Sequence, residues 1–343
     1  MSSDPMKLLA EKGQLVQEHL YRFLKIGTSK DFDEVVRWQV QSGGKRIRPA
    51  LTMLFAEAIE EGSSQKSEVL AAAAAIELIH NFSLVFDDII DRGDLRRGEK
   101  TTRAEYGDEM AVLAGLQHRE AVYHAARATG DDNFPRVLQT LSEAISEMVE
   151  GERLDVLFEQ KTRAFAYYKA HRYGQVTEED YLEMINGKTA SLIKAACVVG
   201  SLVGGGNEQQ IEAAREYGYA AGLAFQIIDD YLDLLGDEKL GKPIGKDIIE
   251  RKLGNYVLIK ALQGLPSEKQ ELLIETIRAD MPDEERVEKA MELINQTNGA
   301  RLAKETALSN IEKAKTPLNA SYPDSSAKTM LVSIADYLVS RLY

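Results

Sequence analysis

The chain has 343 residues, 44% of them hydrophobic, and a net charge of −13 from 42 basic and 55 acidic residues. This composition is ample for one large core. The strongly acidic balance argues against nucleic acid or an anionic membrane as the main partner. No linker or low-complexity block interrupts the sequence, so we expect a single domain over residues 1–343. The only cysteine, Cys197, rules out an intramolecular disulfide and fits a reducing compartment.

No targeting segment is recognisable at the beginning of the chain, since residues 1–12 lack the apolar stretch of a signal peptide. The longest apolar run, residues 69–86, is interrupted by Glu77, His80 and Asn81. These polar residues favour a buried helix over a membrane span. We therefore expect a cytoplasmic protein without stable membrane insertion.

Hydrophobic periodicity near 3.6 residues dominates and strand-like alternation is scarce, which predicts an all-α fold. Capping-box patterns predict helices that open at Thr177 and at Ser267. Residues 41–49 and 236–254 are Gly-rich and predict loops. The other expected helices are 6–26, 32–40, 50–61, 67–91, 101–129 (after an irregular start), 134–173 (one long or broken helix), 207–235 and about three closing helices that end with 327–343.

Two similar acidic motifs end two of the apolar runs. Asp87 and Asp91 are four residues apart, which places both carboxylates on one face of a helix. The pattern returns as DDYLD at 229–233, after the apolar run 220–228. Stacked like charges repel each other, so a cation is expected beside each motif. The recurrence suggests two long antiparallel or facing helices in one bundle.

Acidic residues with few histidines are hard oxygen ligands, which favours Mg²⁺. Mg²⁺ keeps part of its water and is commonly shared with substrate phosphates, so basic residues near the acids suggest a bound diphosphate. Each of these bases could instead be a solvated surface charge. For Lys188, which lies between apolar stretches, the alternative is a side chain that extends along apolar surface. The candidate bases are Lys45, Arg46, Arg48, Arg96, Arg97, Lys188, Lys242, Lys246, Arg251 and Lys252.

A di-iron centre is the competing metal site, because Glu77 and His80 form the Glu-x-x-His pattern of di-iron bundles. Such a site needs a second Glu-x-x-His. None of the other four histidines has an acidic residue three positions before it. The sequence therefore disfavours this reading.

Six motifs in order make the chain resemble the trans-isoprenyl diphosphate synthases (the polyprenyl synthetase family) of the farnesyl and geranylgeranyl diphosphate synthase type. The resemblance covers residues 43–341. Any one motif is weak, but the six in this order are specific. They are GGKRIRP (43–49), ELIHNFSLVFDDIIDRGDLRRG (77–98), GERLD (151–155), KTA (188–190), FQIIDDYLD (225–233) and GKPIGKD (241–247).

The resemblance implies the all-α isoprenoid synthase fold, with long helices around a central catalytic cavity, and a homodimer. It implies head-to-tail (1′-4) condensation of isopentenyl diphosphate with an allylic diphosphate, assisted by three Mg²⁺ ions. The implied metal ligands are Asp87, Asp91 and Asp229, supported by Asp88, Asp230, Asp233 and Asp247. The implied allylic diphosphate ligands are Arg96, Lys188, Lys242 and Lys252; Thr189 and Gln226 would face the allylic cation. The implied isopentenyl diphosphate ligands are Gly44, Lys45, Arg48, His80 and Arg97, with Arg341 as an additional candidate.

The chain departs from the family pattern in several places. Lys100, Leu116, Glu152 and Gly254 stand where the family usually has other residues, and the segment 161–176 is longer than typical, basic and aromatic. None of the departures removes an implied metal ligand or diphosphate base. They leave catalytic rate, partner choice and loop geometry open.

Product length is expected to depend on the helix that carries Asp87. In the resembling family, bulk at the fourth and fifth positions before the first Asp closes the cavity floor, and farnesyl-type animal enzymes tend to have aromatic residues at both. Here these positions are Ser83 and Phe82, with Ile79 a further turn away. One turn rises about 5.4 Å, comparable to one isoprene unit. We therefore expect a C20 product, geranylgeranyl diphosphate, with C15 as the alternative.

Two other functions fit parts of the pattern. A class I terpene cyclase shares the first acidic motif, but such enzymes need no isopentenyl diphosphate site and usually carry a different second motif. A regulatory or inactive synthase subunit would be expected to lose acids from one motif, and this chain keeps both.

Overall fold

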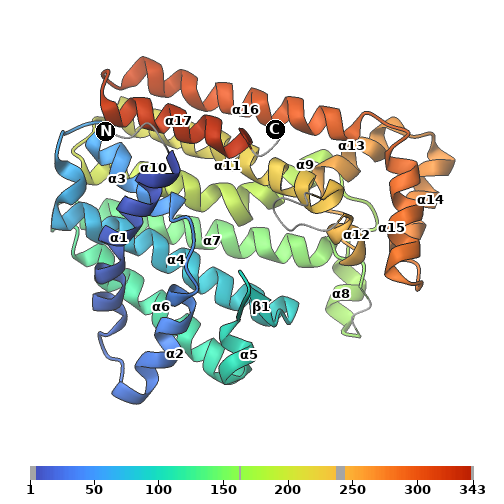
Figure 1. The fold of residues 1–343 in the computed structure, drawn as a ribbon, viewed down its shortest axis with the longest axis horizontal. Coiled ribbons are helices and arrows are strands. Elements are labelled where there is room, and N and C mark those ends of the chain that lie inside the picture. Colours follow the sequence, from blue (N-terminus) through green and yellow to red (C-terminus); the bar gives the residue numbers. More distant parts are fainter. Residues whose placement is uncertain (1–4, 162–163, 237–243, 341–343) are drawn as a thin grey trace. The chain divides into compact units, whose positions relative to one another are not determined.

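The computed structural model describes residues 5–161, 164–236 and 244–340, and the helical character expected from the sequence is confirmed there (Figure 1). The only strands among these residues are β1 (Leu95–Arg96) and β2 (Glu99–Lys100), an antiparallel pair. The helices are α1 Pro5–Leu24, α2 Lys30–Gln41, α3 Ile47–Glu57, η1 Ser63–Gln65, α4 Ser67–Asp91, α5 Thr102–Tyr106, α6 Asp108–Arg127, α7 Phe134–Phe158, α8 Ala166–His171, α9 Glu178–Ile185, η2 Asn186–Ala190, α10 Ser191–Val203, α11 Glu208–Leu235, α12 Lys246–Ile249, α13 Tyr256–Gly264, α14 Ser267–Arg278, α15 Asp283–Ile294, α16 Gly299–Ser321 and α17 Ser326–Ser340.

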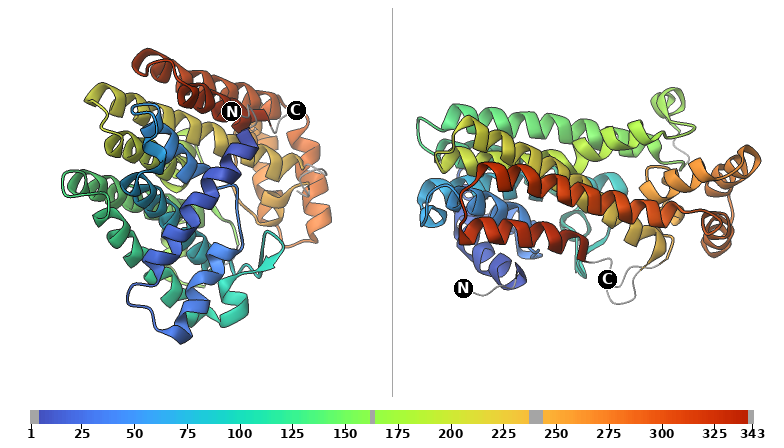
Figure 2. Two further views of the ribbon diagram at one scale, coloured as in Figure 1. Left: turned by 60° about the vertical axis from the view of Figure 1, so that its left-hand side comes forward. Right: turned by 90° about the horizontal axis from the view of Figure 1, so that it is seen from above.

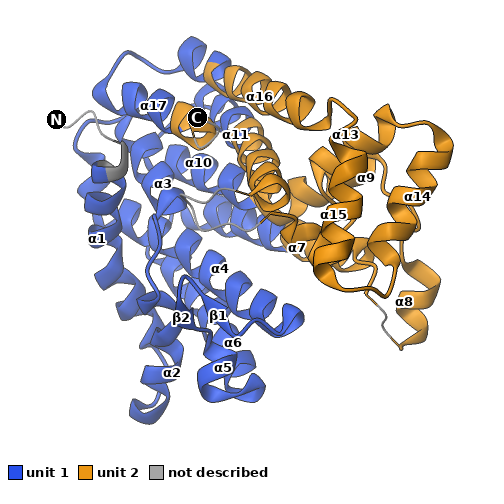
Figure 3. Cartoon of the chain, turned by 45° about the vertical axis from the view of Figure 1, so that its right-hand side comes forward, with its two compact units in different colours: residues 1–145, 192–218, 316–334 blue, residues 146–191, 219–315, 335–343 orange. Residues whose placement is uncertain are grey.

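The chain divides into two compact units, coloured separately in Figure 3. Unit 1 comprises residues 1–145, 192–218 and 316–334, and unit 2 comprises residues 146–191, 219–315 and 335–343. The first acidic motif belongs to unit 1 and the second to unit 2. The single-domain assignment stays a prediction.

Helix α4 is the core of unit 1. Every residue from Val69 to Ile79 is buried, and α6 runs alongside it, as Figures 1 and 2 also show. Close approach is possible because Gly115 of α6 has no side chain: a Cβ there would meet the ring of Phe86. Helix α4 is long and apolar enough to cross a membrane, but 83% of its most hydrophobic window is buried inside the protein. The expectation of a buried core helix is therefore confirmed.

Two predicted helix starts differ from the structure. The helix expected over 101–129 is split at Gly107, whose φ of +86° lies outside the helical region. The capping box expected at Ser267 is wrong, because Pro266 is the N-cap and Ser267 is already the first helical residue. The span 134–173, predicted as one long or broken helix, is broken, as α7 ends at Phe158 and α8 begins at Ala166. The capping box at Thr177 is confirmed, with Asp180 as its partner.

The β1–β2 hairpin was not predicted from the sequence. Its two-residue turn consists of Arg97 and Gly98, with φ values of +56° and +83°. Positive φ at both central positions is the type I′ geometry, whose usual sequence signals are Asn-Gly and Asp-Gly. An arginine in the first position gives no such signal, although the turn is what orients Arg96 and Arg97.

His118 of α6 is a buried, neutral part of the unit 1 core. Its Nε2 donates a hydrogen bond to the Val36 carbonyl at 2.7 Å, and its Nδ1 has no hydrogen-bond partner in the described chain. Burial is the main cause that lowers the pKa of His118 from 6.5 to about 4. The folded state therefore resists protonation at pH values where the unfolded chain accepts a proton.

We predict that stability falls as pH drops from 6.5 towards 4, since in this window the unfolded state binds one more proton at His118. The full contribution is about 3 kcal/mol. Replacing His118→Gln keeps a donor for the Val36 carbonyl and removes the titration. Urea unfolding of both proteins at several pH values measures the effect. The variant should lose less stability across the window, and parallel curves would contradict the assignment.

Candidate active site

The acidic end of α4 carries one buried carboxylate and two that are partly or fully exposed. Asp88 is buried and accepts hydrogen bonds from Arg96 Nε at 3.0 Å and Nη2 at 2.8 Å. Burial raises the pKa of Asp88, and the Arg96 guanidinium opposes that rise. Asp87 is half-buried and Asp91 is exposed. The two predicted metal ligands are thus the more exposed carboxylates of the motif.

The second motif, on α11, repeats this division. Asp230 is buried and accepts hydrogen bonds from Tyr181 Oη at 2.6 Å, Gln226 Nε2 at 2.9 Å and the Tyr256 backbone N–H at 3.0 Å. Burial, strengthened by the charge of Asp247, raises the pKa of Asp230 well above its usual value. Asp229, the predicted metal ligand, is half-buried.

Both motifs occupy the C-terminal turns of their helices, α4 ending at Asp91 and α11 at Leu235. A helix C-terminus carries a partial negative charge, so acidic residues there are unfavourable unless a cation is bound. No cluster of three or more His, Cys, Asp or Glu residues that could hold a metal exists in the described part of the chain. Mg²⁺ does not need such a cluster, because one or two carboxylates and substrate phosphates can complete its octahedron with water. The residues present fit that ion.

Lys188 is positioned by a close crossing of α7 and η2, both in unit 2 at these residues. A Cβ on Gly151 would overlap the backbone nitrogen of Lys188, and a Cβ on Gly187 would overlap the Glu147 carbonyl oxygen. Two glycines are therefore required for the crossing. The π-helical turn η2 contains Lys188 and Thr189, and such turns are frequent at functional sites.

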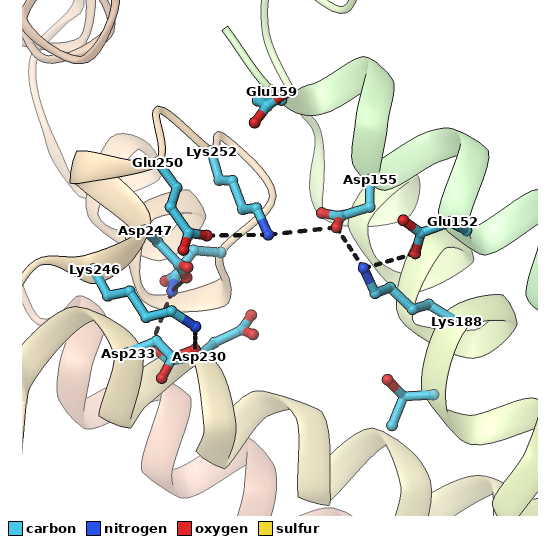
Figure 4. Close-up of polar contacts among 12 residues, drawn as sticks. Glu152, Asp155, Glu159, Lys188, Asp230, Asp233, Lys246, Asp247, Glu250 and Lys252 are labelled. Atoms are coloured by element: carbon cyan, nitrogen blue, oxygen red, sulfur yellow. Dashed lines mark hydrogen bonds and ion pairs between the residues drawn. The ribbon is translucent and has the colours of Figure 1, made fainter. Parts of the chain in front are cut away.

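Lys188 Nζ lies 2.6 Å from Asp155, one turn along α7 from Gly151, and 2.8 Å from Glu152, the residue next to Gly151 (Figure 4). Lys252 Nζ lies 3.6 Å from the same Asp155 carboxylate. Burial of Asp155 works to raise its pKa, but the two ammonium groups outweigh burial and hold the pKa well below the usual value. The structure thus brings together Lys188 and Lys252, which are 64 positions apart in the sequence.

Thr189 and Gln226 also meet, as Thr189 Oγ1 donates a hydrogen bond to Gln226 Oε1 at 2.6 Å. Gln226 in turn donates to Asp230 at 2.9 Å. These hydrogen bonds fix the orientation of both side chains. The Gln226 amide nitrogen faces the Asp230 carboxylate, and the Thr189 hydroxyl, acting as a donor, keeps the lone pairs of its oxygen. Oxygen lone pairs can stabilise a passing positive charge.

Unit 1 carries a separate cationic cluster. Arg48 Nη1 lies 3.4 Å from His80 Nε2, and Arg48 Nε is enclosed with no hydrogen-bond partner in the described chain. Burial is the main cause that holds the pKa of His80 well below its usual value, and the Arg48 and Arg97 guanidiniums lower it further. A neutral His80 and an arginine with a spare N–H are suited to receive an anion.

The Gly-rich loop completes this cluster. Arg97 Nη1 donates a hydrogen bond to the Gly43 carbonyl. Gly44 has a φ of +138°, a backbone conformation that favours glycine, and a Cβ there would lie 2.7 Å from Arg97 Nη1. Arg46, by contrast, forms a buried ion pair with Glu77. This pair also removes Glu77 from any di-iron role.

The comparison with known proteins decides the family. The polyprenyl synthetase family model matches residues 29–294. The chain belongs to this family. It is 35% identical over 338 residues, 98% of both chains, to the short chain isoprenyl diphosphate synthase of Methanothermobacter thermautotrophicus.

Solved structures agree with the assignment. The geranylgeranyl pyrophosphate synthetase of Pyrococcus horikoshii matches with a TM-score of 0.86 and 34% identity over 98% of both chains. A polyprenyl synthase of Caulobacter crescentus, complexed with calcium and isoprenyl diphosphate, matches with a TM-score of 0.82 and 28% identity over 99% of both chains. This polyprenyl synthetase therefore has the isoprenoid synthase fold and is a prenyltransferase, and its family uses Mg²⁺, isopentenyl diphosphate and an allylic diphosphate.

Sequence reasoning missed several residues that shape the site. Tyr181 and Asn255 hold the second motif, since Asn255 Nδ2 donates to the Asp230 carbonyl at 2.9 Å and to Asp247 at 2.7 Å. The GERLD motif gave a signal for Asp155, but only the fold shows its two lysine partners. Among the predicted residues, Lys45 is exposed, and Lys242 and Arg341 lie outside the described residues.

Glu152 adds a negative charge beside the predicted allylic diphosphate lysine. We predict that Glu152→Gln lowers the KM for the allylic diphosphate about fivefold, because a surface charge interaction of about 1 kcal/mol is removed. The KM for isopentenyl diphosphate should not change. Steady-state kinetics with each substrate varied measures this.

The matched control for this prediction is Glu150→Gln, since Glu150 lies on the same helix but pairs only with Arg153 among the described ion pairs. A rise in allylic KM in the Glu152 variant alone would mean that the carboxylate mainly positions Lys188. That result would contradict the repulsion argument.

Proposed function

We propose that this protein is a short-chain prenyl diphosphate synthase that condenses isopentenyl diphosphate with an allylic diphosphate head to tail. The observation that carries the proposal is the presence of two distinct cationic sites. One holds Lys188 and Lys252 around Asp155, and the other holds Arg48, His80 and Arg97. A reaction between two diphosphate esters needs two such sites.

The bases of unit 2 have the chemistry to take up the allylic diphosphate. Lys188 and Lys252 have Asp155 as a shared partner and would exchange that carboxylate for phosphate oxygens. Arg96 of unit 1, bound to Asp88 through Nε and Nη2, keeps further N–H donors for a diphosphate. Thr189 and Gln226 would stabilise the allylic cation that remains when diphosphate departs.

Asp87, Asp91 and Asp229 would hold the metal, for which we propose three Mg²⁺ ions. When bound, Mg²⁺ neutralises the departing diphosphate and so makes it a better leaving group. Arg48, Arg97, His80, Lys45 and the Gly44 backbone would hold isopentenyl diphosphate. Fixed donors in an enclosed site stabilise charge more strongly than water does, because they need no reorganisation.

A C20 product is proposed from the residues on α4. Phe82 is 5% exposed and its ring lies edge-on to Phe86 at 6.2 Å, while Ile79 is fully buried. Ser83 is half-buried and donates a hydrogen bond to the His80 carbonyl at 2.9 Å. One aromatic and one small residue fit a floor that admits a longer tail than two aromatic residues would. The name of the Pyrococcus horikoshii relative, a geranylgeranyl pyrophosphate synthetase, supports this length.

A homodimer in the cytoplasm is proposed as the assembly. Helix α6 exposes an apolar stripe of Val112, Leu113, Leu116 and Tyr123, which follows helical spacing. A stripe of this kind is typical of a surface that a second chain covers.

The test of function uses the purified chain alone with Mg²⁺, an allylic diphosphate and isopentenyl diphosphate, followed by lipid analysis. We expect an elongated linear diphosphate, and we expect Asp87→Asn or Asp229→Asn to lower turnover at least a hundredfold while the fold is kept. A cyclic hydrocarbon from the allylic substrate alone would indicate a terpene cyclase. No turnover without a partner chain would indicate a regulatory subunit.

The chain-length prediction concerns Phe82 and Ser83. Phe82→Ala should lengthen the product, because removing the ring opens about one helical turn, 5.4 Å, of space. Ser83→Phe should shorten the product towards C15. Product distributions by chromatography, together with thermal unfolding, measure both effects.

Phe55→Ala is the control for a simple loss of core volume, since Phe55 is a fully buried ring that contacts Tyr217 and Tyr322. It should lower stability by about 3–5 kcal/mol without changing product length. An unchanged product distribution in Phe82→Ala at full activity would mean that Phe82 only fills the core.

A further inference from the structure

A further cationic pocket lies in unit 2 between α8 and the end of α14. Its volume is about 320 Å³, and its lining includes Lys169, Arg172, Arg278, Gln160, Tyr168 and Tyr173. No acidic residue lines it within the described chain. Ligand pockets of proteins begin at about this size. We call it the α8 pocket.

The local sequence is unusual for so acidic a protein. Residues 161–177 contain four Lys or Arg residues and no Asp or Glu, whereas the whole chain has a net charge of −13. The segment 161–176 is the same stretch that the sequence analysis identified as basic and aromatic. The positive charge is therefore concentrated where the pocket is.

The two arginines are held by neutral groups. Arg278 Nε donates a hydrogen bond to Gln160 Oε1 at 2.9 Å, and its Nη2 donates to the Gly174 carbonyl. Arg172 Nη2 donates to the Lys161 carbonyl. Neither forms an ion pair with a carboxylate in the described chain, in contrast to Arg153 with Glu150. Their side chains are fixed, but their charges are not neutralised.

Gln160 is itself fixed, because its Nε2 donates to the Phe158 carbonyl at 2.9 Å and to the Tyr173 carbonyl at 3.0 Å. Its Oε1 is thereby held towards Arg278. The Arg172 Nε is enclosed and has no hydrogen-bond partner in the described chain. A buried donor without a partner is costly, and an acceptor supplied by a ligand removes that cost.

We infer that the α8 pocket binds a phosphate-bearing anion. Two guanidiniums offer the paired N–H donors that match phosphate oxygens, Lys169 adds a point charge, and the tyrosines can contribute O–H donors. The residues differ from all those proposed for the two substrates. The anion has two possible sources, a soluble diphosphate or the headgroup of an anionic lipid.

The soluble source is tested by amide hydrogen exchange with inorganic diphosphate, in EDTA to prevent metal-dependent binding at the aspartate motifs. Protection is expected in peptides that cover 164–176 and 274–281, separately from any protection near Lys188. Arg172→Gln should weaken the diphosphate affinity of these peptides roughly tenfold or more, because a charge-assisted hydrogen bond is lost. Lys169→Gln, at an exposed position, gives a second variant that leaves the fold intact.

The lipid source is tested by sedimentation with vesicles of phosphatidylglycerol, with phosphatidylcholine vesicles as the neutral reference. Arg153→Gln is the matched control variant, because it removes an arginine of unit 2 that is already paired. Binding of diphosphate or of anionic vesicles that both pocket variants weaken, and the control does not, supports the site. Absence of both kinds of binding, or binding that neither pocket variant changes, overturns it.

Discussion

Like charge at the ends of two long helices is the constraint on which this structure depends. Helices α4 and α11 each place three aspartates in their last turns, where the helix dipole is negative. The protein limits the cost by engaging one or two aspartates of each motif, Asp88 with Arg96 and Asp230 with Tyr181 and Gln226. Asp87 and Asp91 of the first motif and Asp229 of the second are at least partly exposed to solvent. The acidic residues at these helix ends thus lower stability locally, and a bound metal would complete the site.

The lysines of unit 2 likewise need a partner of opposite charge. Before substrate binds, Lys188 and Lys252 need a counter-charge, and the buried Asp155 supplies it to both. The low pKa of Asp155 keeps its carboxylate ionised, so it can pair with both lysines at any time. A diphosphate that displaces the carboxylate must offer more negative charge than it removes. Glu152, an additional carboxylate at 2.8 Å from Lys188, makes that exchange more demanding in this chain.

Sequence patterns predicted what is local and missed what depends on contacts between distant segments. The run of apolar residues before Asp87 is enough to predict α4, and Thr177 with Asp180 is enough to predict a helix start. The π-helical turn at Lys188 has no comparable signal, because it depends on Gly151 and Gly187 meeting across 36 positions of sequence. The sequence motifs identified most of the site residues. Contacts such as that between Lys188 and Asp155 are seen only in the folded structure.

The protein handles positive charge in two ways, and the difference bears on the α8 pocket. In the proposed catalytic site each lysine is balanced by carboxylates, so an incoming anion must compete with them. In the α8 pocket Arg172 and Arg278 are oriented by carbonyl and amide oxygens, which fix geometry without cancelling charge. An anion entering that pocket displaces no carboxylate. It therefore gains the full charge-assisted interaction with no metal required, which is why binding in EDTA distinguishes this pocket from the aspartate motifs.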